Sequence, residues 1–357
     1  GVSGSGKSSI VFDTVAAESQ RQMNETYSAW VRGRLPKYEK PNVEWMENLN
    51  PSVIIDQTRL GGNARSTVGT ISDMYSLLRL LFSRIGTPSV GPASYFSFNN
   101  PNGMCPVCAG IGKIMDFDIN NLINADNTYD EGIFNLPAFG TGNYYWKVYR
   151  RPEYFRTDVP WKDLSKEEQN ILLYGSRSKG GERLDKKLEG VYNQFKRLVL
   201  MKGAEEQTDY TLKKISQFLY ECECPDCKGK RLNKTALSCK INGYNINDMC
   251  EMEFSELRRE LDRINDERAA TIVEQLKASL DRMIDIGLPY LFMNRESSTL
   301  SGGEAQRLKL VRYMGSSLCG MIYIFDEPST GMHPRDVHRM SRLLKNLRDK
   351  GNTVLVV

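Results

Sequence analysis

The chain begins with Gly1-Val2-Ser3-Gly4-Ser5-Gly6-Lys7-Ser8, which has the G-x-x-x-x-G-K-S pattern of a phosphate-binding loop. In such a loop the glycines let backbone N–H groups surround phosphate oxygens. Lys7 neutralises charge on the β- and γ-phosphates, and the Ser8 hydroxyl is placed to ligate Mg²⁺. Residues 8–20 are expected to form the helix whose N-terminus faces the phosphates. We therefore predict nucleotide-binding residues at Gly1, Ser3, Gly4, Ser5, Gly6, Lys7, Ser8 and Ser9.

Two further motifs lie near the other end of the chain. The stretch LSGGEAQ occupies residues 300–306, and IYIFDEP occupies residues 322–328. The apolar run before Asp326 predicts a buried strand that delivers two carboxylates to its carboxyl end. There Asp326 would hold Mg²⁺ through water and Glu327 would polarise the attacking water, as phosphoryl transfer requires. This ordered series identifies an ABC-type ATPase, so we predict ATP and Mg²⁺ as cofactors and catalytic roles for Glu327 and Lys7.

Two other elements complete the predicted ATP site. Residues 51–57 look like a short strand that ends at Gln57. An ABC cassette has its Q-loop glutamine at this place in the series, where Gln57 would contact Mg²⁺ or the attacking water and act in catalysis. Ser301, Gly302 and Gly303 are expected to open a helix and to complete a site on a facing cassette. One cassette makes half of two sites, so we expect a self-dimer or a second cassette as partner.

The eight cysteines are better explained by metal binding than by disulfides. Chain size, the nucleotide motifs and the lack of a secretion leader favour a reducing cytosol. Two C-P-x-C knuckles, at 105–108 and 224–227, are each followed by glycine, and four such sulfurs can enclose a tetrahedral Zn²⁺. Because 115 residues separate the knuckles, spacing alone leaves their pairing open, and Cys222 could compete as a ligand. Buried, unliganded thiols are expected at Cys239, Cys250 and Cys319.

The composition is that of an ordinary globular protein, with 40% hydrophobic and 26% charged residues among 357. No apolar run approaches the roughly eighteen residues of a membrane span, so we expect a cytoplasmic protein with no membrane partner. The net charge is only +4, but residues 141–240 hold 21 Lys and Arg against 14 Asp and Glu. This basic middle suggests an anionic partner, and a merely solvated surface is the alternative.

Aromatic and basic residues interleave at 144–156, and a second basic segment at 186–197 is predicted to be helical. Such mixtures suit DNA, because rings stack on bases while basic groups neutralise phosphates. The alternative for the rings is a small aromatic core in an inserted domain, with contacts left to the basic side chains. The predicted DNA contacts are Lys147, Arg150, Arg151, Lys186, Lys187, Lys196 and Arg197.

Hydrophobic periodicity indicates where the helices pack. Apolar residues recur at helical spacing from 74 to 82, which predicts a core-facing helix ending near Arg84. Charged and apolar residues alternate at helical spacing from 254 to 286, which predicts one or two surface helices. There are no sustained heptads, and this disfavours an ABC ATPase of the chromosome-organising class.

Beyond the ATPase motifs, the whole chain resembles one family, the bacterial excinuclease ATPase subunit UvrA and its UvrA-like relatives. The resemblance implies an ATP-dependent DNA-damage-binding ATPase of nucleotide excision repair. Such a protein acts as a dimer on damaged double-stranded DNA and loads a UvrB-like subunit. It also implies zinc bound by Cys105, Cys108, Cys224 and Cys227, with the intervening stretch near DNA. The resemblance to this family rests on the following segments: FDT at 12–14, DQ at 56–57, ARSTVGT at 64–70, FSFN at 96–99, CPDCKGKRL at 224–232, LSGGEAQR at 300–307 and DEPSTGMHPRD at 326–336.

The fold implied is α/β: an incomplete P-loop ABC-type cassette with an inserted helical signature domain, a four-cysteine zinc module and a small α+β insertion domain. We expect the ATP-binding domain at 1–88 and 296–357, the signature domain with its knuckles at 89–118 and 216–295, and the insertion domain at 119–215.

Three departures from the family pattern matter. First, the chain has one set of cassette motifs and no internal repeat. Second, it lacks a strand before residue 1 and stops before the family's switch histidine. We therefore expect a fragment with little ATP turnover of its own. Third, only nine residues lie between Gly86 and Phe96, where repair-type members insert the domain that docks UvrB.

That short link favours an alternative function, a UvrA-like drug-resistance protein that acts on drug-bound DNA without excision. A ribosome-associated ABC factor is a third hypothesis, disfavoured by the knuckles and the long insertion.

Overall fold

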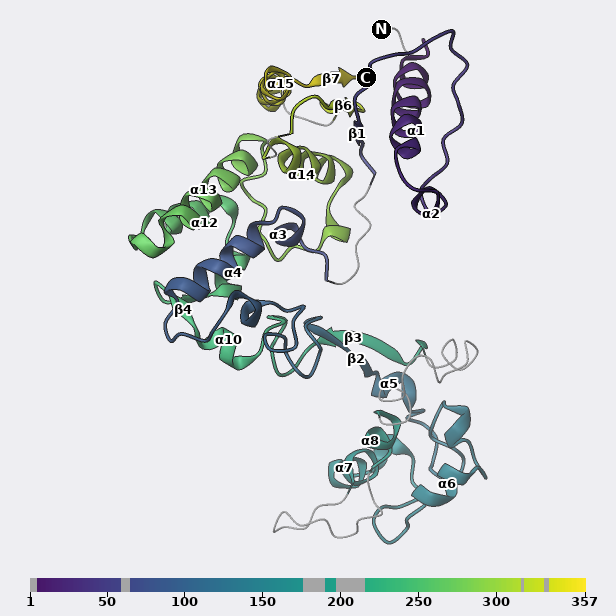
Figure 1. The fold of residues 1–357 in the computed structure, drawn as a ribbon. Helices are drawn as coiled ribbons and strands as arrows, with labels where there is room; N and C mark the ends of the chain where they lie inside the picture. The colour runs from purple at the N-terminus through teal and green to yellow at the C-terminus, as the bar shows by residue number, and fades with distance from the viewer. Residues whose placement is uncertain (1–4, 59–64, 176–189, 197–215, 316–317, 331–333) are drawn as a thin grey trace. The chain divides into compact units, whose positions relative to one another are not determined.

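The fold is described from a computed structural model, which covers residues 5–58, 65–175, 190–196, 216–315, 318–330 and 334–357 (Figure 1). The chain forms two compact units. One combines Gly1–Ile111 with Lys230–Val357, and the other is Gly112–Gly229. No helix among the described residues is both long enough and apolar enough to cross a membrane.

A three-stranded parallel sheet forms the nucleotide-binding part of the first unit. Its strands are β1 (Ser52–Ile55), β6 (Ile322–Phe325) and β7 (Thr353–Val356), in the order β1-β6-β7. All four residues of β6 are buried, as expected for a central parallel strand with both faces covered. The predicted strands at 51–57 and 321–325 are thus confirmed.

One long helical segment follows the phosphate loop and packs on this sheet. It begins as a π-helix, η1 (Ser9–Ala16), and continues as α1 (Ala17–Glu25), so it runs further than the predicted end at residue 20. Arg21 forms ion pairs with Glu18 and Glu25, one turn away on either side, and these pairs contribute to the stability of the extension. The helix is fixed to the strand by Gln20 Nε2, which donates to the Ser52 carbonyl at 2.8 Å.

The rest of the first unit is mainly helical. The principal helices are α4 (Met74–Ile85), α12 (Phe254–Asp262), α13 (Ala270–Asp285) and α14 (Gly302–Met314), and α15 (Pro334–Asp349) joins β6 to β7. Shorter elements are α2 (Ala29–Arg32), α3 (Val68–Ile71), η2 (Ala93–Phe96), α10 (Lys234–Ser238), β4 (Lys240–Ile241), β5 (Tyr244–Asn245), α11 (Ile246–Glu251), η7 (Glu267–Ala269) and η8 (Ser297–Thr299).

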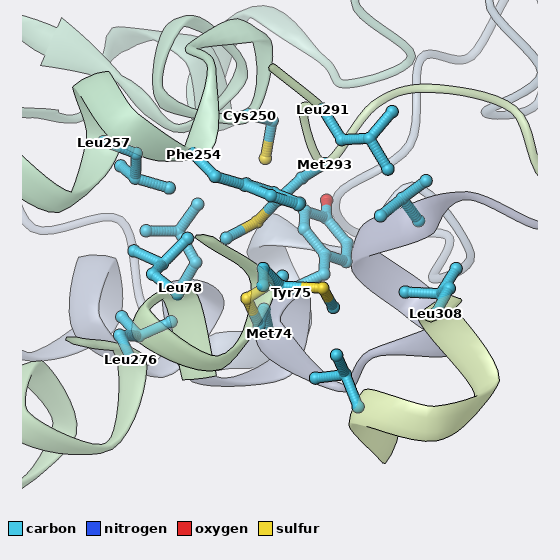
Figure 2. Close-up of a cluster of buried hydrophobic side chains, with 14 of the residues drawn as sticks. Met74, Tyr75, Leu78, Cys250, Phe254, Leu257, Leu276, Leu291, Met293 and Leu308 are labelled. Carbon is cyan, nitrogen blue, oxygen red and sulfur yellow. The ribbon is translucent and has the colours of Figure 1, made fainter. Parts of the chain in front are cut away.

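The core of this unit surrounds α4. Met74, Leu78, Leu81 and Phe82 are buried along one stripe of the helix, as its periodicity predicted. Figure 2 shows Met74, Tyr75 and Leu78 among side chains of α12, α13 and α14. A separate short helix, α3, precedes α4, and the two are divided at Asp73, which adopts a left-handed conformation with φ of 61°.

The second unit is a small α+β domain. A two-stranded antiparallel ribbon pairs β2 (Lys113–Phe117) with β3 (Leu219–Glu223). Its core is rich in rings, with Phe117 edge-on to Phe195 at 4.9 Å and Phe139 stacked on Tyr145 at 4.9 Å. The other elements are α5 (Ile119–Leu122), η3 (Pro137–Phe139), α6 (Tyr144–Tyr149), η4 (Trp161–Asp163), α7 (Lys166–Tyr174) and α8 (Val191–Phe195). The predicted α/β class with a small α+β insertion is confirmed.

Candidate functional site

The carboxyl ends of β1 and β6 bring the predicted catalytic groups together. Ile55 pairs in register with Phe325, so Asp56-Gln57 and Asp326-Glu327 leave the same edge of the sheet. Gln57 Nε2 then donates a hydrogen bond of 3.3 Å to the Glu327 carbonyl oxygen. Parallel α/β sheets bind ligands at this edge, so the arrangement suits a nucleotide and its metal.

Glu327 is held in an uncommon backbone conformation. Its φ is 41°, a left-handed value that costs a non-glycine residue about 1 kcal/mol or more. The Glu327 N–H donates to the Val357 carbonyl at 3.1 Å, and the carboxylate accepts from Thr330 Oγ1 at 3.1 Å. Because the backbone is fixed on both sides, the strand end sets the position from which the Glu327 carboxylate projects.

The described part of the phosphate loop fits a bound anion. Gly6 has a φ of +77° and nothing within 4 Å of where a Cβ would lie, so conformation, not space, requires glycine there. Lys7 and Ser8 follow at the N-terminus of η1, with Ser8 and Ser9 exposed. Exposed hydroxyls and the N–H groups of a helix N-terminus are suited to phosphate. The predicted contacts Gly1, Ser3 and Gly4 lie outside the described residues.

The signature motif begins α14 with a reciprocal cap. The Ser301 backbone N–H donates to Glu304 Oε2 at 2.8 Å, and Ser301 Oγ accepts from the Glu304 N–H at 3.3 Å. Glu304 also accepts from Tyr290 Oη at 3.0 Å and pairs with Arg295 at 3.2 Å. Burial would raise the pKa of Glu304, but the hydrogen bonds from Ser301 and Tyr290 and the charge of Arg295 outweigh it and lower that pKa.

The two signature glycines differ in their surroundings. A Cβ on Gly302 would lie 3.0 Å from the Gln57 carbonyl oxygen, whereas a Cβ on Gly303 would meet nothing within 4 Å. The start of α14 therefore lies directly against the backbone of Gln57.

Sequence reasoning missed two residues further along α14. Gln306 Nε2 donates to the carbonyl oxygens of Asp326 at 2.7 Å and Ile55 at 3.2 Å. Lys309 forms an ion pair of 2.7 Å with Asp56. The only sequence signal is their helical spacing from Gly302, which places all three on one face.

The two cysteine knuckles meet. The sulfurs of Cys105, Cys108, Cys224 and Cys227 all lie within 4.8 Å of one another, and all four residues are buried. Four buried thiols at this separation match a closed tetrahedral zinc site, so the donor set fits the ion. Cys222 is not part of the group, which answers the question left open by the spacing.

Matching tight turns follow the knuckles. Ala109 and Gly110 have φ values of 49° and 80°, and Lys228 and Gly229 have 48° and 74°. A Cβ on Gly110 would come within 1.9 Å of the Phe98 carbonyl oxygen. Both conformation and space therefore require glycine at this position.

The thiols outside the four-cysteine group differ in their exposure. Cys239 and Cys250 are buried, as expected, and burial raises the pKa of each. The prediction for Cys319 is wrong, because this residue is exposed in the loop before β6.

The aromatic and basic residues of the second unit have different surroundings. Tyr149 and Phe155 are buried and Tyr145 and Trp146 pack on the core, which supports the alternative that the rings form a core, although Tyr144 is exposed. Three of the predicted basic contacts are paired with acidic groups: Arg150 with Asp130 at 2.6 Å, Arg151 with Glu153 at 3.7 Å, and Lys196 with Asp116 at 3.8 Å.

Lys147 differs from these residues, because its side chain is exposed and makes no hydrogen bond or ion pair with any residue that the structure describes. Its charge is therefore more available to an anion than the charges of Arg150, Arg151 and Lys196, which are paired with acidic groups. The predicted contacts Lys186, Lys187 and Arg197 lie outside the described residues.

Comparisons with known proteins agree with these features. Residues 122–214 match the model of the UvrA DNA-binding domain. Over its whole length the chain is 29% identical to UvrABC system protein A of Methanothermobacter thermautotrophicus and 28% identical to that of Staphylococcus aureus, in each case covering 54% of the relative. The chain thus spans about half the length of the curated relatives it matches.

A solved structure shares the fold. The whole chain superposes on 48% of UvrA2 from Deinococcus radiodurans, with a TM-score of 0.76 and 31% identity. The order of motifs and the parallel sheet thus occur in a chain that is similar to UvrA proteins along its entire length.

Proposed function

We propose that this chain is the ATP-binding and DNA-proximal part of a DNA-damage-binding ATPase of nucleotide excision repair. The observation that carries the proposal is the contact between Gln57 and Glu327 at the edge of a parallel sheet. It occurs in a chain whose residues 122–214 match a DNA-binding domain. A second cassette or a second copy would complete the ATP site.

ATP with Mg²⁺ would supply the phosphoryl group that is transferred to water. In this proposal Lys7 and the loop amides bind the phosphates, while Ser8, Gln57 and Asp326 hold the metal. Glu327 orients the attacking water and takes its proton. Ser301, Gly302 and Gly303 present their polar groups to the nucleotide of the facing cassette.

Zinc has a structural role in the proposal. The four clustered cysteines would enclose the ion with no open position, so it would hold the two knuckles together and take no part in hydrolysis.

Double-stranded damaged DNA is the proposed partner of the second unit. Its contacts would be basic side chains, with Lys147 the best supported because its charge is not paired within the described residues. A UvrB-like subunit would act downstream of DNA binding.

The test uses Glu327→Gln with Glu39→Gln as the matched control, since Glu39 is exposed and away from the strand ends. In the full-length protein that contains this chain, we expect Glu327→Gln to lower kcat for ATP by roughly 100-fold or more while nucleotide binding persists, as for loss of a positioned general base. Filter binding with damaged and undamaged duplexes, with and without ATP, measures the coupling. Absence of DNA binding at low salt would exclude the DNA-binding part of the proposal.

A second candidate function has its own observation. Residues 86–92 alone connect α4 to η2. Thr87 in this link forms an isolated antiparallel β-bridge with Lys240. The alignment to the archaeal relative covers 522 positions, 165 more than this chain has residues. A missing docking domain at this link would suit a UvrA-like protein that acts on drug-bound DNA without excision. Damage-dependent incision in a reaction reconstituted with the partner subunits would exclude it.

A further inference from the structure

We propose that Gln306 and Lys309 of the signature helix are positioning residues for ATP hydrolysis. Through them, α14 would fix the ends of β1 and β6 and so aim Gln57 and Glu327. This inference rests on the proposed ATPase function. It concerns two residues that would act through the protein groups they hold.

Gln306 joins the two catalytic strands. Its side chain is buried, with 2% of its surface exposed, and one amide nitrogen donates to the carbonyl oxygens of both Ile55 and Asp326. The direct backbone bond at this level, from the Asp326 N–H to the Ile55 carbonyl, is long at 3.4 Å. The Gln306 amide therefore reinforces the sheet at the point where both strands give way to catalytic residues.

Lys309 holds the residues on either side of Gln57. Its ammonium group lies 2.7 Å from Asp56 Oδ1 and 3.3 Å from the Asp56 carbonyl oxygen. It also lies 3.1 Å from the Thr58 carbonyl oxygen and 3.2 Å from the Thr58 hydroxyl. An ammonium group has three donors in a compact arrangement, which suits several oxygens of one turn.

Gly302, Gln306 and Lys309 follow one another at the spacing of a single helix face. The first approaches the Gln57 backbone, the second binds both strand ends, and the third binds the turn around Gln57. Any displacement of α14, whose first residues would meet a facing nucleotide, would therefore be transmitted to Gln57 and to the Glu327 strand end.

Each contact has an experimental variant. Gln306→Met keeps approximate volume but removes both donors, and Lys309→Ala removes the half-buried ion pair with less risk to folding. Lys309→Arg is the conservative rescue. Arg312→Ala is the matched control, because Arg312 is exposed in the last turn of the same helix.

Steady-state kcat, the affinity for a fluorescent ATP analogue and thermal unfolding are measured for each protein. We expect Gln306→Met and Lys309→Ala to lower kcat by roughly 10- to 100-fold, the range associated with misplaced catalytic groups. We expect nucleotide affinity to change less than about twofold, because ground-state contacts are retained. Lys309→Arg should recover most of the rate, and Arg312→Ala should match the wild type.

A double-mutant cycle separates positioning from general destabilisation. If Lys309 acts through Asp56, then Lys309→Ala combined with Asp56→Asn should be no slower than the slower single variant. Wild-type kcat in Lys309→Ala, or losses that multiply in the double variant, would overturn the inference while leaving the ATPase proposal intact. Failure of the full-length protein that contains this chain to hydrolyse ATP when it is bound to DNA would overturn both.

Discussion

Gln57 and Glu327 are 270 positions apart in the chain, yet the Gln57 side chain donates a 3.3 Å hydrogen bond to the Glu327 backbone carbonyl. The bond joins the residue that would sense the metal to the residue that would direct the attacking water. It forms because β1 and β6 are adjacent parallel strands whose ends coincide in register. Structural changes at either strand end would therefore affect both groups.

Loss of one knuckle cysteine should remove the zinc. We expect Cys105→Ser to lose most of its bound metal and to unfold at a lower temperature, because a closed site contributes directly to folding. Metal content by mass spectrometry and calorimetric melting test this. Cys319→Ser, which alters an exposed thiol outside the cluster, should keep both metal and stability. Cys222→Ser should also keep the metal, and its loss there would contradict the assigned ligand set.

Replacing Gly110, in the turn that follows the first cysteine knuckle, by alanine should destabilise the protein. Gly110→Ala would hold alanine at a φ of +80° and place its Cβ 1.9 Å from the Phe98 carbonyl oxygen. The conformation alone costs about 1–2 kcal/mol, and the clash adds to it. Gly33→Ala is the control, because this glycine has a φ of −64° and its nearest neighbours are 3.6 and 3.7 Å away. Equal urea midpoints for the two variants would contradict the prediction.

The cap of the signature helix should weaken in acid. The folded-state pKa of Glu304 is lowered, so its carboxylate stabilises the fold above its ordinary pKa of about 4.3. That contribution is lost as the pH falls through the depressed folded-state value. We expect Glu304→Gln to lower the free energy of unfolding by about 2 kcal/mol at neutral pH, typical of hydrogen bonds to a charged group, and by less as the pH falls below about 4.

Urea titrations across this pH range measure the effect. Glu267→Gln is the control, since Glu267 is exposed and lies outside the cap. A destabilisation by Glu304→Gln that stays constant as the solution is acidified would argue against a depressed pKa.

Lys147 and Arg150 should differ in their contribution to DNA binding, although they are only three positions apart in the chain. Lys147→Ala should reduce the slope of log affinity against log salt by about 0.9, the value for one lost phosphate contact. Arg150→Ala should change it less, because two guanidinium N–H groups already bind Asp130, at 2.6 and 2.9 Å. Fluorescence anisotropy with a labelled duplex provides the slopes. A larger effect for Arg150→Ala would mean that DNA displaces Asp130.

The sequence predicted the chemical groups more completely than their arrangement. The phosphate loop, the signature motif and the Asp326-Glu327 pair are local patterns, and each requires its residue types at fixed short spacing. The α4 stripe was likewise predictable, because a helix with one buried face repeats apolar residues every three or four positions. The departure in helix length was local as well: α1 runs past residue 20 to Glu25, and Arg21 pairs with Glu18 and Glu25 in this stretch.

By itself, then, the sequence determined the fold class, the residues of the proposed ATP site and the cysteines proposed to bind zinc. Only the tertiary structure decided that knuckles 115 residues apart meet, that Cys222 is excluded, and that Gln306 and Lys309 bind the strand ends. It also decided which basic side chains are already paired. The reason is physical: short-range spacing is imposed by helix and turn geometry, whereas contacts between distant segments depend on how the strands and helices pack around a common core.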